Sequence, residues 1–302
     1  MMRITITGAS GFVGQNLVPY LKDKNYSVRI LSVRNDSWKS QDVMDTGVFI
    51  HLAGKAHDTA NTSSAEEYFK VNRDLTIELF NHFLKSEAKD FIYFSSVKAV
   101  ADTVEGILTE EVEAKPFTPY GQSKYEAEQY LLNTQLPEGK RVFIIRPCMI
   151  HGPGNKGNLN LLYKVVEKGI PWPLASFENH RSFLSIDNLC YLVDQMMNNP
   201  NVLSGVYNFA DDKALSTNEL VTLLARVSNK KPKLWHISKG FMNGVAAIGD
   251  KIKLPLNSER LKKLTENYMV SNNKIKRALE VKELPVSAEE GLEKTIRSFK
   301  EK

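Results

Sequence analysis

The sequence predicts an α/β protein with a doubly wound parallel sheet, and two observations carry this prediction. Short apolar runs of the kind found in buried strands recur along the chain, and the intervals between them have helical periodicity. Such alternation is typical of a parallel sheet covered by helices on both faces. The strand-like runs are Arg3 to Thr7, Val28 to Val33, Val48 to Leu52, Phe91 to Ser95 and Val142 to Arg146, and the clearest helical intervals are Tyr68 to Leu84 and Tyr120 to Leu132.

The first predicted strand runs into a glycine turn that opens a helix. Glycines permit a tight turn, close approach of the backbone to a phosphate, and contact between helix and sheet. The free N–H groups and the positive dipole end of a helix N-terminus attract an anion. Helical apolar spacing and a second strand follow, which completes a βαβ unit. We therefore expect a pyrophosphate site at Gly8, Ser10, Gly11, Phe12, Val13 and Gly14.

The chain changes character after Pro147, because loop-rich stretches then interrupt only short periodic segments. We predict a nucleotide-binding domain at 1–150 and a smaller substrate-binding lobe at 151–302, with a strand near 205–210 that returns to the main sheet. The interval from Arg34 to Gly47 has room for one short crossover but not for a full helix, strand and second helix. We therefore expect the adenine side of the nucleotide site to be shorter than in a full doubly wound domain.

Composition limits the class of protein. With 302 residues, 42% hydrophobic and 25% charged, the chain reads as globular, which excludes disordered and fibrous classes. The net charge of +5 is modest, and we interpret the basic residues as spread along the chain, so no nucleic-acid partner is expected. Cys148 and Cys190 lack a redox motif, and we find no signal peptide and no apolar run near the ~20 residues of a membrane span. These features predict a cytoplasmic protein with free thiols and no membrane partner.

A tyrosine and a lysine four residues apart form the candidate catalytic pair. Thr118 and Pro119 suit the N-cap and first position of a helix, which places Tyr120 and Lys124 on one helix face. A phenol has a pKa of about 10, and a nearby lysine cation and an oxidised nicotinamide would both favour the phenolate. The pair Ser95-Ser96 ends a predicted strand, where the sites of α/β proteins gather.

A series of motifs follows in order along the chain. They are Gly8-x-x-Gly11-x-x-Gly14, His51-Leu-Ala-Gly54, Asn72, Phe94-Ser-Ser-Val-Lys98, Tyr120-x-x-x-Lys124, Arg146-Pro147 and Arg181-Ser-Phe-Leu-Ser-Ile-Asp187. Together they resemble the extended short-chain dehydrogenase/reductases, specifically the nucleotide-sugar epimerase/dehydratase group, over nearly the whole chain. The resemblance implies a Rossmann-type domain, a small C-terminal lobe for a nucleotide sugar, and NAD(P) as cofactor.

The resemblance also implies a role for each matching residue. Tyr120 would be the acid/base at a sugar hydroxyl or ketone, and Lys124 would hold the nicotinamide ribose and lower the tyrosine pKa. Ser96 would hydrogen-bond the same sugar oxygen, with Ser95 as the alternative serine. The substrate residues implied are Arg181, at the diphosphate, and Asn158, in the substrate loop. The further cofactor contacts implied are Leu52, Ala53, Gly54, Asn72 and Pro147.

Histidines are given minor roles. We interpret His51 as a hydrogen-bonded strand-end residue, and we give His57 and His151, near the same rim, little functional weight. The six histidines have no paired ligand spacing, so no metal is expected.

The end of the second predicted strand departs from the NAD-binding pattern. NAD-preferring relatives carry Asp or Glu there to bind the ribose hydroxyls, whereas this chain has Ser32 and Arg34. A hydroxyl and a cation suit a 2′-phosphate better than a diol. NADP(H) is therefore favoured over NAD(H).

The resemblance leaves the reaction open between three functions. We favour a reductase of a UDP-linked 4-keto-6-deoxy-hexosamine in surface-polysaccharide biosynthesis, because a trimmed adenine side suits cofactor exchange. A UDP-hexose 4-epimerase, acting on UDP-N-acetylglucosamine or UDP-glucose, is the alternative. A non-catalytic NAD(P)-sensing protein is the alternative of another class, and the intact Tyr120 and Lys124 argue against it. A homodimer also agrees with the resemblance, since family members commonly dimerise through helices flanking the sheet.

Overall fold

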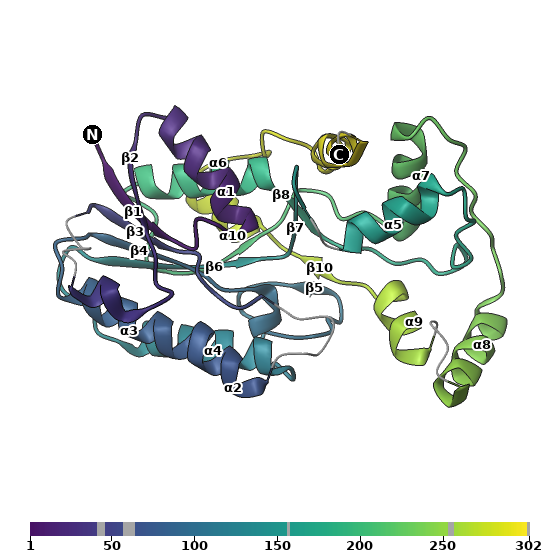
Figure 1. The fold of residues 1–302 in the computed structure, drawn as a ribbon, viewed down its shortest axis with the longest axis horizontal. Coiled ribbons are helices and arrows are strands. Elements are labelled where there is room, and N and C mark those ends of the chain that lie inside the picture. Colours follow the sequence, from purple (N-terminus) through teal and green to yellow (C-terminus); the bar gives the residue numbers. More distant parts are fainter. Residues whose placement is uncertain (41–45, 57–63, 156–157, 253–256, 301–302) are drawn as a thin grey trace.

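The central feature of the computed structural model, which describes residues 1–40, 46–56, 64–155, 158–252 and 257–300, is a six-stranded sheet (Figure 1). Its strand order is β2-β1-β3-β4-β6-β9, and every neighbouring pair is parallel. The predicted doubly wound α/β class is confirmed. The strands are β1 (Arg3–Thr7), β2 (Ser27–Leu31), β3 (Val48–His51), β4 (Asp90–Phe94), β6 (Arg141–Pro147) and β9 (Gly205–Phe209).

Helices cover both faces of this sheet. Figure 1 shows α1 (Phe12–Asp23), α6 (Ile186–Asn198) and α10 (Asn273–Ala278) on one face. On the other face lie α2 (Ala65–Tyr68), α3 (Leu75–Leu84) and α4 (Pro119–Asn133). The central strands are therefore buried on both sides, which explains why β4 is apolar at nearly every position.

The crossover between β2 and β3 is short. Its described part contains a 3-10 turn at Asp36–Ser40, and residues 41–45 lie outside the described residues. Trp38 in this turn is buried and packs edge-to-face on His82, with ring centroids 5.0 Å apart. Trp38 thus belongs to the apolar core that Phe49 of β3 and Phe80 of α3 also line.

A smaller lobe follows β6 and has its own apolar core. In it β7 (Met149–His151) pairs in parallel with β8 (Phe183–Ser185). The core joins apolar side chains such as Leu159, Phe183, Leu224 and Leu292. The helices of this lobe are α5 (Asn158–Glu167), α7 (Thr217–Val227), α8 (Lys239–Ile252), α9 (Ser258–Thr265) and α11 (Ala288–Lys300). A two-stranded pairing of β5 (Ile107–Leu108) with β10 (Met269–Val270) joins the two parts.

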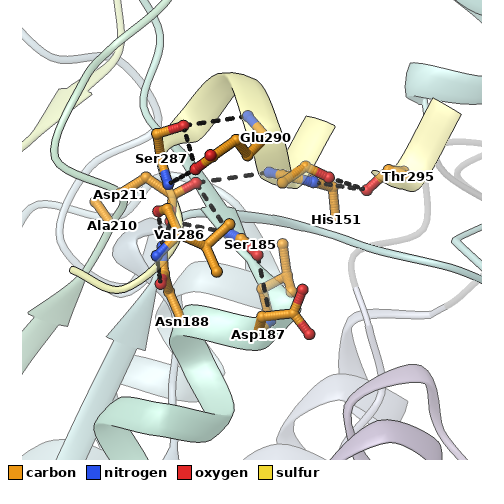
Figure 2. Close-up of polar contacts among 12 residues, drawn as sticks. His151, Ser185, Asp187, Asn188, Ala210, Asp211, Val286, Ser287, Glu290 and Thr295 are labelled. Carbon is orange, nitrogen blue, oxygen red and sulfur yellow. Dashed lines mark hydrogen bonds and ion pairs between the residues drawn. The ribbon is translucent and has the colours of Figure 1, made fainter. Parts of the chain in front are cut away.

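A buried polar network ties the lobe to the sheet (Figure 2). Asp211, just after β9, accepts hydrogen bonds from the Ser185 amide at 3.0 Å and from Asn188 Nδ2 at 2.7 Å. Asn188 Nδ2 also donates to the Val286 carbonyl at 2.7 Å, next to α11. The network therefore connects α6, the end of β9 and the start of α11 through one carboxylate and one amide.

None of the helices in the described part of the chain is long and apolar enough to cross a membrane. Cys148 and Cys190 are both buried and unpaired, as expected from their spacing.

Candidate active site

The glycine turn lies at the carboxyl edge of the sheet and is shaped by close backbone contacts. Gly8 has φ +71°, and a Cβ there would lie 2.5 Å from the Ala53 amide nitrogen. A Cβ on Gly14 would lie 2.5 Å from the Ala9 Cα. Both positions therefore require glycine.

Helix α1 begins beside this turn with its first N–H groups free of a side-chain cap. Gly11 is the N-cap and provides no side chain, and Ser10 and Gly11 are both exposed. Phe12 and Val13 are partly buried at the first turn of the helix. An uncapped helix N-terminus next to an exposed glycine turn fits a pyrophosphate.

The end of β3 brings the glycine turn close to Lys124. Leu52, Ala53 and Gly54 follow the strand, and the Ala53 amide donates to Thr7 Oγ1 at 3.2 Å. A Cβ on Gly54 would lie 3.2 Å from Lys124 Nζ and 3.1 Å from Asn72 Oδ1. The absence of a side chain at Gly54 leaves a cradle in front of the lysine.

Asn72 is fully buried, and its amide binds the protein itself. Its Oδ1 accepts from the Lys55 amide at 2.8 Å, and its Nδ2 donates to the Lys55 carbonyl at 3.1 Å and to Ser123 Oγ at 3.2 Å. These bonds join the segment after β3 to α4. The contacts described for Asn72 therefore position the segment after β3 against α4, on either side of the site.

The N-terminus of α4 is fixed against the segment that follows β4. Thr118 caps the helix by accepting from the Gly121 amide at 3.3 Å, as predicted, with Pro119 in the first turn. A Cβ on Gly121 would overlap the Lys98 carbonyl oxygen. Asp102 accepts from the amides of Phe117 at 2.9 Å and Thr118 at 3.1 Å. Asp102 was not predicted as a site residue, because its partners lie 15 and 16 residues further along the chain and no local motif marks it.

Ser96 faces Tyr120, whereas Ser95 faces a buried carboxylate. Burial raises the pKa of Tyr120, and a hydrogen bond with the Ser96 side chain opposes this by lowering it. Ser95 Oγ instead binds Glu128 Oε1. Of the two serines considered from the sequence, the structure brings Ser96 to the tyrosine.

Lys124 is buried one helical turn beyond Tyr120. Its Nζ donates to the Phe94 carbonyl at 2.8 Å and lies 4.9 Å from the Tyr93 ring centroid. Burial lowers the pKa of Lys124 from its ordinary value of 10.5 to about 8, and the charge of Glu128 opposes this shift. At neutral pH the lysine beside Gly54 is therefore still mainly protonated, but it loses its proton more readily than an exposed lysine does.

Beneath the site, Glu128 forms a buried ion pair with Arg146. Arg146 Nε lies 3.0 Å from Glu128 Oε1, and both side chains are almost fully enclosed. Glu128 follows Lys124 by four residues, so its helical spacing was the available signal for this missed residue. The carboxylate binds Ser95 and Arg146 and also acts on the charge of Lys124.

The residues predicted to bind the adenosine end of the cofactor are exposed to solvent. Ser32 and Arg34 follow β2 and are exposed. Pro147 is buried at the end of β6, on the same carboxyl edge of the sheet as the glycine turn.

On the substrate side, Arg181 lies against the end of α9. Its Nη2 donates to the Lys263 carbonyl at 2.6 Å and its Nε to the Glu266 carbonyl at 3.3 Å. Burial lowers the pKa of Lys98, and the positive charge of Arg181 acts in the same direction. Arg181 and the segment after β4 that contains Ser96 and Lys98 therefore face a common region. Asn158 begins α5, but its side chain, like His57, lies outside the described residues.

The described histidines near the site are held by hydrogen bonds. His51 is buried, with Nδ1 2.7 Å from Thr7 Oγ1 and Nε2 3.0 Å from Thr76 Oγ1, which confirms its structural role. Burial lowers the pKa of His51 to about 3, with the Lys124 charge acting in the same direction. His151 Nδ1 lies 2.9 Å from Thr295 Oγ1 in the polar network of Figure 2. Among the described residues no group of three His, Cys, Asp or Glu side chains could hold a metal ion.

A doubly wound sheet with a glycine turn and a Tyr-x-x-x-Lys pair at its carboxyl edge defines a dinucleotide-dependent enzyme of the extended short-chain dehydrogenase/reductase class. The chain belongs to the NAD dependent epimerase/dehydratase family, which it matches over residues 4–210. It is an NAD(P)-dependent enzyme, and this sets aside the non-catalytic sensing protein.

Individual relatives agree with this membership. A UDP-glucose 4-epimerase of Vibrio cholerae is 34% identical over 250 residues, 75% of this chain and 76% of that protein. An N-acetyl-alpha-D-glucosaminyl-diphospho-ditrans,octacis-undecaprenol 4-epimerase of Escherichia coli O157:H7 is 27% identical over 97% of this chain and 94% of its own. The structure of RMD from Pseudomonas aeruginosa complexed with NADPH has a TM-score of 0.76 over 100% of both chains at 20% identity, which shows the shared fold.

Proposed function

We propose that the protein catalyses oxidoreduction at C4 of a UDP-linked sugar, with Tyr120 as acid/base. The observation that carries the proposal is the meeting of Ser96, Tyr120 and Lys124 at the carboxyl edge of the sheet, next to the glycine turn. The family already establishes nucleotide-sugar epimerase/reductase chemistry as the class.

Each of these side chains has a distinct task in the proposal. A bound nicotinamide supplies or accepts the hydride at the sugar carbon. Tyr120 gives the proton to, or takes it from, the sugar oxygen, and Ser96 hydrogen-bonds that same oxygen. The cationic form of Lys124 stabilises the phenolate of Tyr120 and binds the cofactor ribose across the Gly54 cradle.

The glycine turn after β1 supports cofactor binding at the other end of the site. We propose that Gly8, Ser10, Gly11, Phe12, Val13 and Gly14 surround the pyrophosphate, with Leu52, Ala53, Gly54 and Pro147 as the wall beside it. The exposed Ser32 and Arg34 support binding of a 2′-phosphate, and hence NADP(H) over NAD(H). Asn72 supports this wall through its bonds to Lys55.

We assign the substrate diphosphate to Arg181, and we assign Asn158, the first residue of α5, to substrate binding as well. The guanidinium already donates to carbonyls at the end of α9, so its position is fixed before a ligand arrives. A fixed guanidinium loses little freedom on binding an anion, which favours a charge-assisted contact.

The favoured direction is reduction of a UDP-linked 4-keto-6-deoxy-hexosamine for surface-polysaccharide biosynthesis. A reductase must release its spent cofactor in every turnover, whereas an epimerase returns the hydride to the same sugar. The short crossover at Asp36–Ser40 and the exposed end of β2 support an exchangeable cofactor.

A second candidate is 4-epimerisation of UDP-N-acetylglucosamine or UDP-glucose. Two of the relatives carry 4-epimerase names, and one of them matches nearly the whole chain. One of those names states a UDP-sugar substrate and the other a sugar on a diphospho-undecaprenol, so both substrates place a sugar on a diphosphate.

Two parallel reactions with purified protein separate the candidates. The first supplies a UDP-linked 4-keto-6-deoxy sugar with NADPH and follows the absorbance of the reduced nicotinamide. The second supplies UDP-N-acetylglucosamine with catalytic NAD and follows the 4-epimer by chromatography. Stoichiometric consumption in the first reaction supports reduction. Conversion in the second without consumption in the first overturns it in favour of epimerisation, and no conversion of either substrate overturns the C4 proposal.

A further inference from the structure

The net positive charge of the chain lies in one segment of the C-terminal lobe. Residues 230–264 contain nine Lys and Arg residues and two acidic ones, a net charge of +7. The whole chain has 40 basic and 35 acidic residues, which leaves 31 and 33 elsewhere, a net charge of −2. The basic residues are thus spread along the chain, with 31 of the 40 outside this segment, but the net charge is not. The basic segment, as we call residues 230–264, carries more than the entire net charge.

The same segment exposes apolar side chains along one helix. On α8 the side chains of Phe241, Ile248 and Ile252 are 63%, 56% and 62% exposed, and Val245 is partly exposed. Their spacing of four, three and four residues places all of them on one helical face. We call these four residues the α8 stripe.

The α8 stripe is distinct from the face that holds α8 to the protein. Met242, Ala246 and Gly249 are buried, and the first two belong to the core of the lobe. Helix geometry puts their centre about 100° around the axis from the α8 stripe. The stripe is thus a second apolar face that the described residues leave exposed.

Basic side chains flank this face. Lys251 lies on the exposed side of α8, and Lys262 and Lys263 are exposed on α9, which packs beside α8. Figure 1 shows α8 and α9 together at the end of the lobe, away from the central sheet. Trp235, just before α8, is 56% exposed, and an indole suits the boundary between water and lipid.

We propose that α8 and α9 dock on the surface of an anionic lipid bilayer, with the α8 stripe in the headgroup region. A helix with an exposed apolar face and basic surroundings binds by apolar burial together with attraction to anionic lipid. A nucleic acid would use the cations but not the aliphatic side chains of the stripe. A second copy of the chain would bring the same +7 segment against the first and be repelled.

This surface contact departs from the expectation of no membrane partner, which rested on the lack of a spanning segment. It also lies close to the substrate side of the enzyme, because Arg181 donates to the Lys263 carbonyl at the end of α9. The proposal does not depend on the reaction at C4, and its test requires no turnover.

Vesicle flotation tests the contact with the full chain. Vesicles of phosphatidylglycerol and phosphatidylcholine in equal parts should carry the protein upward at low salt, and pure phosphatidylcholine should carry far less. High salt should release most of the bound protein, because the charge contribution is screened. The double variants Phe241→Asn/Ile248→Asn and Lys251→Glu/Lys262→Glu should each raise the lipid concentration for half-binding by about tenfold or more.

Matched controls come from the nucleotide-binding part. Leu203 is 75% exposed there, so Leu203→Asn should leave flotation unchanged, as should Lys22→Glu/Lys85→Glu. Circular dichroism and NADPH affinity should be unaltered in all variants. Absence of flotation on anionic vesicles overturns the proposal, as does an equal loss in the control variants. Concentration-dependent self-association that the α8 double variant abolishes, without vesicle binding, overturns it in favour of a second copy.

Discussion

At the scale of single residues, Lys124 shows that the site is built at a cost to stability. Its ammonium group is buried with one carbonyl partner, and its pKa is lowered from 10.5 to about 8. A shift of this size corresponds to roughly 3 kcal/mol of destabilisation of the charged form. Active sites commonly retain such groups because the chemistry requires them.

We therefore expect Lys124→Met to stabilise the protein while abolishing turnover. Below about pH 8 the lysine is charged in both folded and unfolded chains, so the full cost is present. As the pH rises from about 8 toward 10.5, the folded lysine loses its proton first, and the stability of the wild type rises. Urea unfolding should show the variant more stable by up to about 3 kcal/mol at neutral pH, with a smaller difference at alkaline pH. Lys164→Met, at an exposed site, is the control; an equal gain there would contradict the explanation.

The phenol of Tyr120 is the second residue-scale test. Tyr120→Phe removes the proton-transfer group but keeps the ring that packs edge-to-face on Tyr68 at 5.9 Å. Turnover should fall by about 10²-fold or more, the usual scale for losing a general acid/base, while cofactor affinity is retained. Steady-state kinetics and calorimetric titration measure the two quantities. Near wild-type turnover in the variant would remove Tyr120 from the mechanism.

Cofactor choice is expected to depend on Arg34. The proposed 2′-phosphate contact predicts tighter binding of NADP(H) than NAD(H), and Arg34→Glu should erase or reverse that preference. A charge-assisted contact of about 1.5–3 kcal/mol corresponds to roughly 10- to 100-fold in affinity. Calorimetry with both cofactors measures it, with Arg29→Glu, at an exposed position within β2, as the matched charge reversal. Equal affinities in the wild type would disprove the assignment.

Single residues were predictable where a local motif carries the role. The spacing of Tyr120 and Lys124 and the cap at Thr118 follow from helix geometry alone. The choice of Ser96 over Ser95 was not predictable, because it depends on which serine Glu128 and Tyr120 each bind across the fold. The polar contacts of Asp102 and Asn72 are likewise tertiary and leave no periodic signal.

At the scale of elements, the six strands of the central sheet were located within one or two residues, and their ends were set by their neighbours, whereas the short strands β5, β7, β8 and β10 were not predicted. The second strand was expected to run to Val33 but ends at Leu31, because β1 ends at Thr7, its partner, and then turns at Gly8. The interval from Tyr68 to Leu84 was expected to be one regular helix. It contains a π-helical turn at Phe69–Asp74, which places Asn72 against Lys55 and Ser123. Only the assembled fold supplies those partners.

The approach of α4 to the segment after β4 yields an element-scale prediction. Gly121→Ala should push the helix away from Lys98, because the added Cβ would overlap its carbonyl oxygen. Such overpacking costs about 1–3 kcal/mol. A displaced α4 also separates Tyr120 from Ser96, so turnover should fall by about tenfold or more. Urea unfolding and steady-state kinetics measure the two effects. Gly240→Ala, in α8 where a Cβ meets open space, should lower neither quantity.

At the scale of the whole molecule, the lobe and the sheet are held together by polar contacts as well as apolar packing. Asp211→Ala removes both acceptor oxygens from the buried Ser185 amide and one partner from Asn188 Nδ2. Unsatisfied buried groups of this kind cost about 1–3 kcal/mol. Urea unfolding should show that loss, whereas the exposed Asp23→Ala should not. An unchanged midpoint for Asp211→Ala would show that the network contributes little.

The strand order also determines when the central sheet can be completed during synthesis of the chain. The edge of β6 is covered by β9, yet 57 residues separate Pro147 from Gly205 in the chain. At about 5–20 residues per second, a ribosome needs roughly 3–12 s to deliver the missing strand. During that interval the nascent sheet presents an open edge to other chains. Yield in a producing cell should therefore respond to translation speed and to chaperones that shield strand edges.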